Sequence, residues 1–146
     1  MSACLFCQIV AGTVPAKKLY EDEHTLAFLD AFPLSEGHTL VVPKTHYELL
    51  QDMPTEEAQH LFATLHKLLP KLQQGTRAEA MTVGLNNGEV AGQAVPHVHL
   101  HLIPRHPGDG GGSLHAVVHQ ADQQPVDDVY ETLEATLGPG RVGRHR

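Results

Sequence analysis

Three histidines stand at alternate positions near residue 100, separated by aliphatic residues in the run HVHLHLI, residues 97–103. Successive side chains of a strand point to opposite faces, so a strand here places His97, His99 and His101 on one face and the aliphatic side chains on the other. Imidazole is not a favoured strand residue. Three of them in strict alternation therefore indicate chemistry rather than a solvated sheet surface.

Two kinds of chemistry fit a row of imidazoles. A His-x-His pair can present two nitrogens to a transition metal ion. Alternatively, a neutral imidazole can attack phosphorus while its neighbours hold the oxygens. The preceding run NNGEVAGQAV, residues 86–95, favours phosphate, because a glycine-punctuated loop can offer backbone N–H groups to an anion and Glu89 is its only acid. A metalloenzyme that uses the histidines as ligands remains an open alternative.

A second group with chemical potential lies near the start of the chain. Cys4 and Cys7 have the Cys-x-x-Cys spacing of half a tetrahedral zinc site. A thioredoxin-like redox motif is excluded by the absence of a predicted strand before the pair. Two free thiols remain the alternative to a metal site.

The overall composition limits the classes of protein to which the chain can belong. The 146 residues are 41% hydrophobic and 18% charged, which predicts one folded domain with a core. A net charge of −7 argues against nonspecific nucleic-acid binding. Apolar runs are too short to span a membrane, and two cysteines are too few for a disulfide scaffold. With no export signal apparent, we expect a cytoplasmic protein.

The elements that must position these residues alternate between strand and helix periods. From Thr55 the apolar residues recur at helical spacing, and we expect Pro70 to end or kink this helix and Gly75 to finish it. A second amphipathic helix is expected over 126–137, followed by a basic tail over 141–146. The expected short elements are a helical turn at 4–10 and strands at 19–20, 25–30, 38–42, 81–85 and 97–103. This order predicts an α+β domain with an antiparallel sheet.

The run AGQAVPHVHLHLIPR, residues 91–105, resembles the signature of the histidine triad family. Similar stretches occur at residues 5–10, 26–30 and 37–44 and at Asn86, so the resemblance covers residues 4–105. It implies a HIT-like fold with a five-stranded antiparallel sheet, one long helix and a short N-terminal helix. The sheet would continue across a homodimer. Residues 1–105 would form the domain core, with residues 106–146 belonging to the same domain.

The resemblance also implies an activity, the hydrolysis or transfer of a purine nucleotide. His99 would attack the α-phosphorus of a nucleoside phosphoramidate or dinucleoside polyphosphate, forming a nucleotidyl-histidine that water releases as a nucleoside monophosphate. His101 would bind a phosphate oxygen, and His38 would complete the catalytic group. A nucleotide-binding regulatory module with vestigial hydrolysis is the alternative.

The remaining roles concern substrate binding. Asp30 would bind the ribose hydroxyls, whereas core packing is the competing explanation for the base-pocket residues. Some members carry Ser or Thr where this chain has Ala94, and the missing hydroxyl argues against efficient phosphoramidate cleavage. The residues assigned to nucleotide binding are Phe6, Ile9, Phe28, Leu29, Asp30, Asn86, Gln93, Ala94, Val95, His99 and His101.

The resemblance finally suggests partners for the cysteine pair. Some histidine triad proteins hold zinc with two Cys and two His residues. The matching set in this chain is Cys4, Cys7, His46 and His97. This implies one structural zinc per chain, which would remove His97 from the reaction.

Overall fold

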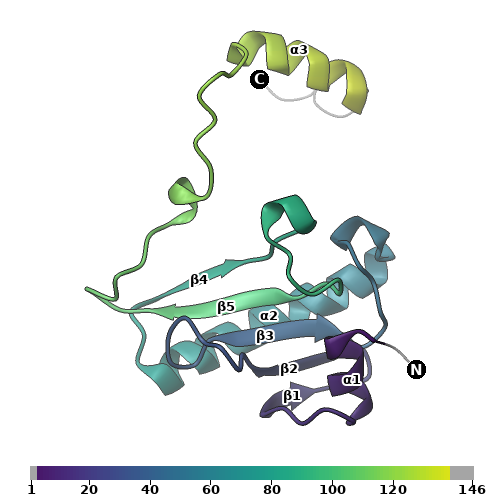
Figure 1. Ribbon diagram of the computed structural model, residues 1–146, viewed down its shortest axis with the longest axis vertical. Helices are drawn as coiled ribbons and strands as arrows, with labels where there is room; N and C mark the ends of the chain where they lie inside the picture. Colours follow the sequence, from purple (N-terminus) through teal and green to yellow (C-terminus); the bar gives the residue numbers. More distant parts are fainter. Residues whose placement is uncertain (1–2, 139–146) are drawn as a thin grey trace. The chain divides into compact units, whose positions relative to one another are not determined.

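The computed structural model describes residues 3–138 and separates into two compact units, residues 1–111 and 112–146. The first unit contains every described strand and the two helices α1 and α2, and the second contains α3 (Figure 1). The division falls six residues after Arg105, close to the predicted limit of the domain core. The assignment of residues 106–146 to the same domain stays a prediction.

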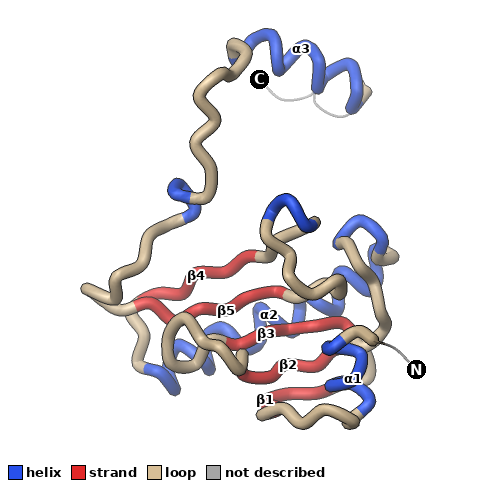
Figure 2. Tube along the Cα trace, in the orientation of Figure 1, coloured by secondary structure: helices blue, strands red, loops and turns tan. Residues whose placement is uncertain are grey.

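The first unit is built on a five-stranded antiparallel sheet, as predicted (Figure 2). The strand order is β1-β2-β3-β5-β4, so β4 lies at an edge beside β5. The histidine-bearing strand therefore lies inside the sheet, between two neighbours. The strands are β1 (Lys18–Glu21), β2 (Thr25–Leu29), β3 (Thr39–Pro43), β4 (Ala80–Gly84) and β5 (Leu100–Arg105).

The long helix α2 (Thr55–Thr76) covers one face of the sheet. Its buried residues Leu61, Leu65 and Leu68 pack with Val98, Leu100 and Leu102 in one hydrophobic cluster. Pro70 does not end the helix, which continues to Thr76, one residue past the predicted finish at Gly75. Pro70 is exposed, so its missing N–H removes one intrahelical bond on the solvent side without unpacking the buried stripe.

The short helix α1 (Leu5–Ala11) covers the opposite face of the sheet. Phe6 and Ile9 of α1 are buried against Phe28 and Leu40, whereas the alternate strand residues Ala27 and Val41 belong to the cluster under α2. This alternation follows from the two-residue period of a strand. Figure 1 shows α1 and α2 on opposite sides of the strands. Gly12 ends α1 with φ of 86°, a left-handed conformation that suits glycine.

The predicted strand over 97–103 is displaced toward the C-terminus, because the hydrogen-bonded ladder begins at Leu100 and ends at Arg105. After Pro96, the His97 N–H donates to Val95 O and the Val98 N–H donates to Tyr47 O, so these groups leave the ladder. The alternation of side chains still holds, since Val98, Leu100 and Leu102 are all buried under α2. His97 and His99 thus lie on an extended segment just before the strand.

The second unit contains the amphipathic helix α3 (Val126–Leu137), which has the predicted bounds and is followed by Gly138. Its apolar residues are exposed, including Val126, Tyr130 and Leu133. The predicted basic tail, residues 141–146, lies outside the described residues. Over residues 3–138, no helix combines the length and apolar character needed to cross a bilayer.

Candidate active site and metal centre

The histidines predicted to act together lie together on the α1 side of the sheet. The ring centroids of His99 and His101 are 5.1 Å apart, and the His38 ring lies 5.1 Å from that of His101. His38 directly precedes β3, which pairs with β5, so two adjacent strands bring these rings together. Phe6 of α1 contacts His99 edge-on at a centroid distance of 5.0 Å.

His99 has one ring nitrogen fixed by the main chain. Its Nδ1 lies 2.7 Å from the carbonyl oxygen of His97, and a carbonyl can only accept a hydrogen bond. The proton of the neutral ring therefore resides on Nδ1. Its Nε2 keeps a lone pair, which is the requirement for a nucleophile.

His38 and His101 are oriented by a chain of hydrogen bonds that starts at a main-chain amide. The Leu34 N–H donates to His38 Nδ1 at 3.1 Å, so the neutral His38 ring carries its proton on Nε2. His38 Nε2 lies 2.9 Å from His101 Nδ1 and donates to it. The remaining proton of neutral His101 consequently lies on Nε2, the atom suited to donate to a phosphoryl oxygen.

Burial keeps these rings uncharged at neutral pH. Desolvation by burial is the largest cause that lowers the pKa of His101 to about 4, and the nearby rings of His99 and His38 lower it further. Burial also lowers the pKa of His38, although the Asp30 carboxylate opposes the shift. Neutral rings fit the hydrogen bonds from Leu34 to His38 and from His38 to His101, because an imidazolium has no nitrogen that can accept a hydrogen bond.

Asp30, predicted to bind ribose hydroxyls, lies beside His38 and His101. One carboxylate oxygen accepts from the Phe32 N–H at 2.9 Å, and the other lies 3.6 Å from His38 Nε2. Together with His38 and His101, the Asp30 carboxylate forms a group of three side chains that could hold a metal ion. Its role toward a ribose stays a prediction.

The predicted base-pocket residues are packed as a hydrophobic cluster. Phe6, Ile9 and Phe28 are buried, and Phe6 meets Phe28 edge-on at 5.6 Å, whereas Leu29 is half-buried. Such packing fits both the core and the wall of a base pocket, so the assignment of these residues to the base stays a prediction. Phe6 also touches His99, so the cluster lies beside the predicted nucleophile.

The loop before the histidines is held by one of the predicted binding residues. The Gln93 side chain accepts from the Gly88 N–H at 2.8 Å and donates to Glu48 O at 2.7 Å and Val95 O at 3.1 Å. Its amide thus shapes the loop. Asn86 lies beside Gly92, whose φ of +105° is a backbone conformation that suits glycine. The roles of both in nucleotide binding stay predictions.

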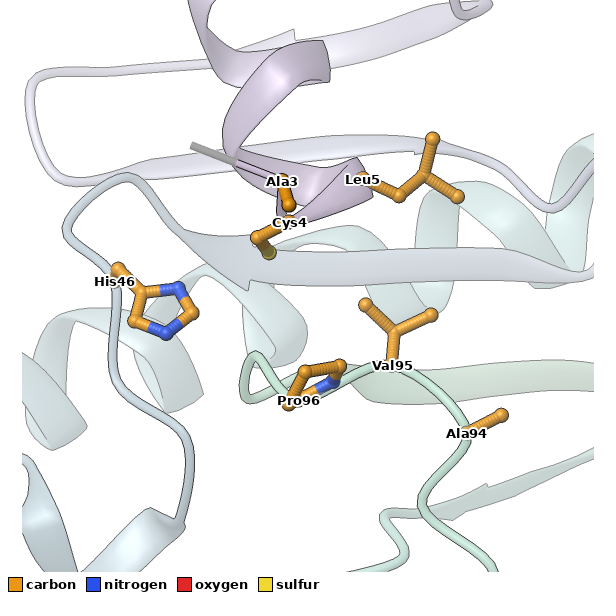
Figure 3. A pocket seen from close by; sticks show the side chains of 7 residues that line it. All are labelled: Ala3, Cys4, Leu5, His46, Ala94, Val95 and Pro96. Atoms are coloured by element: carbon orange, nitrogen blue, oxygen red, sulfur yellow. The ribbon is translucent and has the colours of Figure 1, made fainter. Parts of the chain in front are cut away.

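Ala94 and Val95 line a pocket of about 490 Å³ beside the start of α1 (Figure 3). The pocket has no carboxylate, lysine or arginine among its lining residues, which are Ala3, Cys4, Leu5, His46, Ala94, Val95 and Pro96. Cys4 and His46 connect it to a second group of side chains.

That second group is the predicted zinc set, and its four residues lie together although they come from three parts of the chain. Cys4 Sγ and Cys7 Sγ lie 3.4 Å and 3.6 Å from His97 Nδ1. His46 Nδ1 lies 3.2 Å from both Cys7 Sγ and His97 Nδ1. Zinc–sulfur and zinc–nitrogen bonds in a tetrahedron separate ligand atoms by about 3.3–3.8 Å. Two of the donor distances lie in this range and the two that involve His46 lie just below it, so the donor set suits zinc.

His97 presents the correct nitrogen to such a metal. Its Nε2 lies 2.9 Å from Pro43 O and donates to it, so Nδ1 keeps the lone pair that faces the thiols. Burial is the largest cause that lowers the pKa of His97 to about 4, which keeps the ring neutral. The prediction that zinc binding removes His97 from the reaction is consistent with this geometry.

Two supporting groups were not predicted from the sequence. The Leu34 N–H fixes His38, and Ser35 ties the same loop to β5 by donating from Oγ to Pro104 O at 2.7 Å. Any residue but proline supplies a main-chain N–H, so nothing in the residue type of Leu34 marks it. The available signal is the position of their loop, which joins two predicted site residues, Asp30 and His38.

Fold and site together define an antiparallel α+β protein with a three-histidine centre and a Cys2His2 group that could hold a metal ion. A family model described as the HIT domain matches residues 11–108. The chain therefore belongs to the HIT, or histidine triad, family.

Individual relatives agree with that membership. A crystal structure of a HIT family protein from Bacillus anthracis has a TM-score of 0.82 at 35% identity, covering 93% of this chain and 95% of that one. The Zn-bound histidine triad protein from Mycobacterium smegmatis has a TM-score of 0.70 at 33% identity, covering 92% and 97%. Adenosine 5'-monophosphoramidase HNT1 of Saccharomyces cerevisiae is 33% identical over 136 residues, covering 93% of this chain and 84% of its own.

Proposed function

We propose that this protein is a nucleotide hydrolase or transferase that cleaves at the α-phosphorus of a purine nucleoside phosphoramidate or dinucleoside polyphosphate. The observation that carries the proposal is the 2.7 Å bond from His99 Nδ1 to His97 O, which leaves the Nε2 lone pair free to attack. Similarity to the yeast phosphoramidase supports the reaction class.

The reaction has two displacement steps. In the first, His99 Nε2 forms a bond to the α-phosphorus while the bond from phosphorus to the leaving nitrogen or oxygen breaks, and the leaving group takes up a proton from solvent. In the second, water attacks the same phosphorus and gives up a proton to solvent, the bond to His99 Nε2 breaks and returns its electron pair to the ring, and a nucleoside monophosphate is released. In both steps the His101 Nε2–H donates to a phosphoryl oxygen. The hydrogen bond from His38 Nε2 to His101 Nδ1 supports this, because it leaves the His101 proton on Nε2.

Substrate binding falls to the residues around the nucleophile. Asp30 accepts hydrogen bonds from the ribose, and the cluster that includes Phe6 and Phe28 lies beside the base. Ala94 offers no hydroxyl to the leaving atom, so we expect slower phosphoramidate cleavage than a Ser or Thr at this position would allow.

We further propose one structural zinc per chain at Cys4, Cys7, His46 and His97. The donor distances and the tautomer of His97 support it, as does the zinc-bound relative from Mycobacterium smegmatis. When bound, zinc supplies a closed tetrahedral link between α1, the loop after β3 and the segment before β5. Its thiolates must stay reduced, which agrees with a cytoplasmic location.

We propose a homodimer in which the sheet continues from one chain to the next. In the described part of the chain, β4 pairs with β5 and forms one edge of the sheet. An open edge presents unpaired N–H and C=O groups that a second copy can satisfy. Sedimentation equilibrium tests this proposal, and a mass of one chain at micromolar concentration would contradict it.

The decisive experiment for the function measures turnover of adenosine phosphoramidate and diadenosine polyphosphates by the wild type and by His99→Ala. We expect His99→Ala to lose about 10³-fold or more, because the nucleophile has no substitute. His66→Ala is the matched control, since His66 is exposed on α2.

The same experiment separates the alternatives. Equal turnover by wild type and His99→Ala would reject the role of His99, and tight nucleotide binding without turnover would favour a regulatory module. Loss of activity in EDTA as complete as that of His99→Ala, with an unchanged circular dichroism spectrum, would favour a metalloenzyme. Circular dichroism is needed because removal of a structural metal can itself unfold the chain.

A further inference from the structure

His97 takes part in two sites through different atoms. Its ring Nδ1 faces the Cys4 and Cys7 thiols, and its ring Nε2 donates to Pro43 O. Its main-chain carbonyl accepts from His99 Nδ1 at 2.7 Å. A single fully buried residue therefore joins the metal site to the acceptor that sets the tautomer of the nucleophile.

The segment that carries this carbonyl lies outside the sheet ladder, which begins at Leu100. One of its main-chain bonds, His97 N–H to Val95 O, is internal to the segment, and Val98 N–H to Tyr47 O anchors it to the loop after β3. The His97 side chain supplies further anchors, the Pro43 bond and the metal donors. The direction of the His97 carbonyl is thus set jointly by the Tyr47 bond, which holds the same planar peptide unit through the Val98 N–H, and by how the His97 ring is held.

We propose that His97 is a positioning residue through which the metal fixes the catalytic tautomer of His99. With a metal on Nδ1 and Pro43 O on Nε2, the ring would be held at both nitrogens. The His97 carbonyl would then stay in place to accept from His99 Nδ1. Without the metal, Nδ1 keeps only its contacts with the two thiols and His46, which constrain the ring less than a metal bond does. His99 then loses part of its Nδ1–H preference, and the other tautomer has no lone pair on Nε2.

The expected size follows from comparable outer-shell contacts. Loss of a group that orients a functional ligand costs about 10–100-fold in activity. We therefore expect removal of zinc to lower kcat by about 10-fold while KM changes by less than about 2-fold, because the binding wall around Phe6 and Phe28 is packed by its own apolar contacts. This inference rests on the proposed function.

The test measures the His99 tautomer directly. Protein labelled with ¹⁵N at histidine is compared with zinc bound and after chelation, with the His99 signals assigned from His99→Gln. We expect the zinc form to show protonated Nδ1 and bare Nε2, the chelated form to show a mixture of tautomers, and added zinc to restore the first pattern. An unchanged tautomer and kcat in folded, zinc-free protein would overturn the inference while leaving the proposed function intact.

Two variants at saturating zinc decide the matter if the zinc-free chain unfolds. His97→Cys keeps a metal ligand but deletes the bond to Pro43, whereas His97→Ala deletes both. We expect His97→Cys to retain the wild-type tautomer of His99 and His97→Ala to lose it. Equal disturbance in both variants, or disturbance in neither, contradicts positioning through the metal. His66→Ala again serves as the control.

Discussion

His38 Nε2 lies 2.9 Å from His101 Nδ1, and this bond sets the direction in which both rings can donate. Because the Leu34 N–H occupies the other nitrogen of His38, the proton between the two rings belongs to His38. The Nε2–H of His101 is then available to a phosphoryl oxygen. The main-chain amide of Leu34, four residues before His38, thereby orders the His101 ring on β5.

The first prediction removes this ordering. His38→Ala should lower kcat by about 10–100-fold with little change in KM, because the neutral His101 ring then exchanges between two tautomers. His38→Asn should recover part of the loss, since its side-chain N–H₂ can donate to His101 Nδ1. Steady-state kinetics measures both. An Asn variant no better than the Ala variant would argue against a role for the hydrogen bond.

The second prediction concerns the dependence of stability on pH. The pKa of His101 is about 4 in the folded chain against 6.5 for an ordinary histidine, so the unfolded chain binds more protons between these values. The free energy of unfolding should stay level above about pH 7 and fall as the pH drops below 6.5, by at most about 1.4 kcal/mol per pH unit for this group.

Urea unfolding from pH 4.5 to 8 measures this contribution. His101→Asn should show a shallower fall than the wild type, whereas the exposed control His66→Asn should not. Zinc loss at low pH affects all three proteins alike, so the difference in slope isolates His101. Identical slopes for His101→Asn and the wild type would contradict the lowered pKa.

The third prediction tests the loop that carries Leu34. Gly37 has φ of +92°, and a Cβ there would lie 2.5 Å from Thr76 Cγ2. Gly37→Ala should therefore lower the free energy of unfolding by more than about 1 kcal/mol. Gly75→Ala is the matched control, because that helical position has open space and should gain about 0.5–1 kcal/mol. Chemical denaturation measures both, and a neutral Gly37→Ala would refute the steric argument.

The fourth prediction concerns the metal itself. Well-folded protein should retain about one zinc per chain after extensive dialysis, and Cys7→Ser should lose it, because a serine hydroxyl is a far weaker zinc ligand than a thiolate. Elemental analysis and the thermal midpoint Tm provide the measurements. The Tm of Cys7→Ser should fall and no longer respond to added zinc. Folded wild-type protein without zinc would disprove the structural metal.

Much of this arrangement could be predicted because it depends on local periodicity. The alternation of His97, His99 and His101 with aliphatic residues places them on the face away from α2, whatever the sheet order. The five strands, the long helix and the α3 bounds were likewise predicted correctly from the spacing of apolar residues. The Cys-x-x-Cys spacing of Cys4 and Cys7 predicted half of a set of residues that could hold zinc.

The tertiary structure decided the rest, because it depends on main-chain groups and on contacts between distant segments. The start of β5 at Leu100 and the commitment of the Gln93 amide to its own loop were not predicted, and of the two outcomes expected at Pro70 an end to α2 did not occur. The sequence supplied the histidines, but residue types do not encode tautomers. Those are set by Pro43 O, His97 O and the Leu34 N–H, whose positions exist only once the strands and loops have packed.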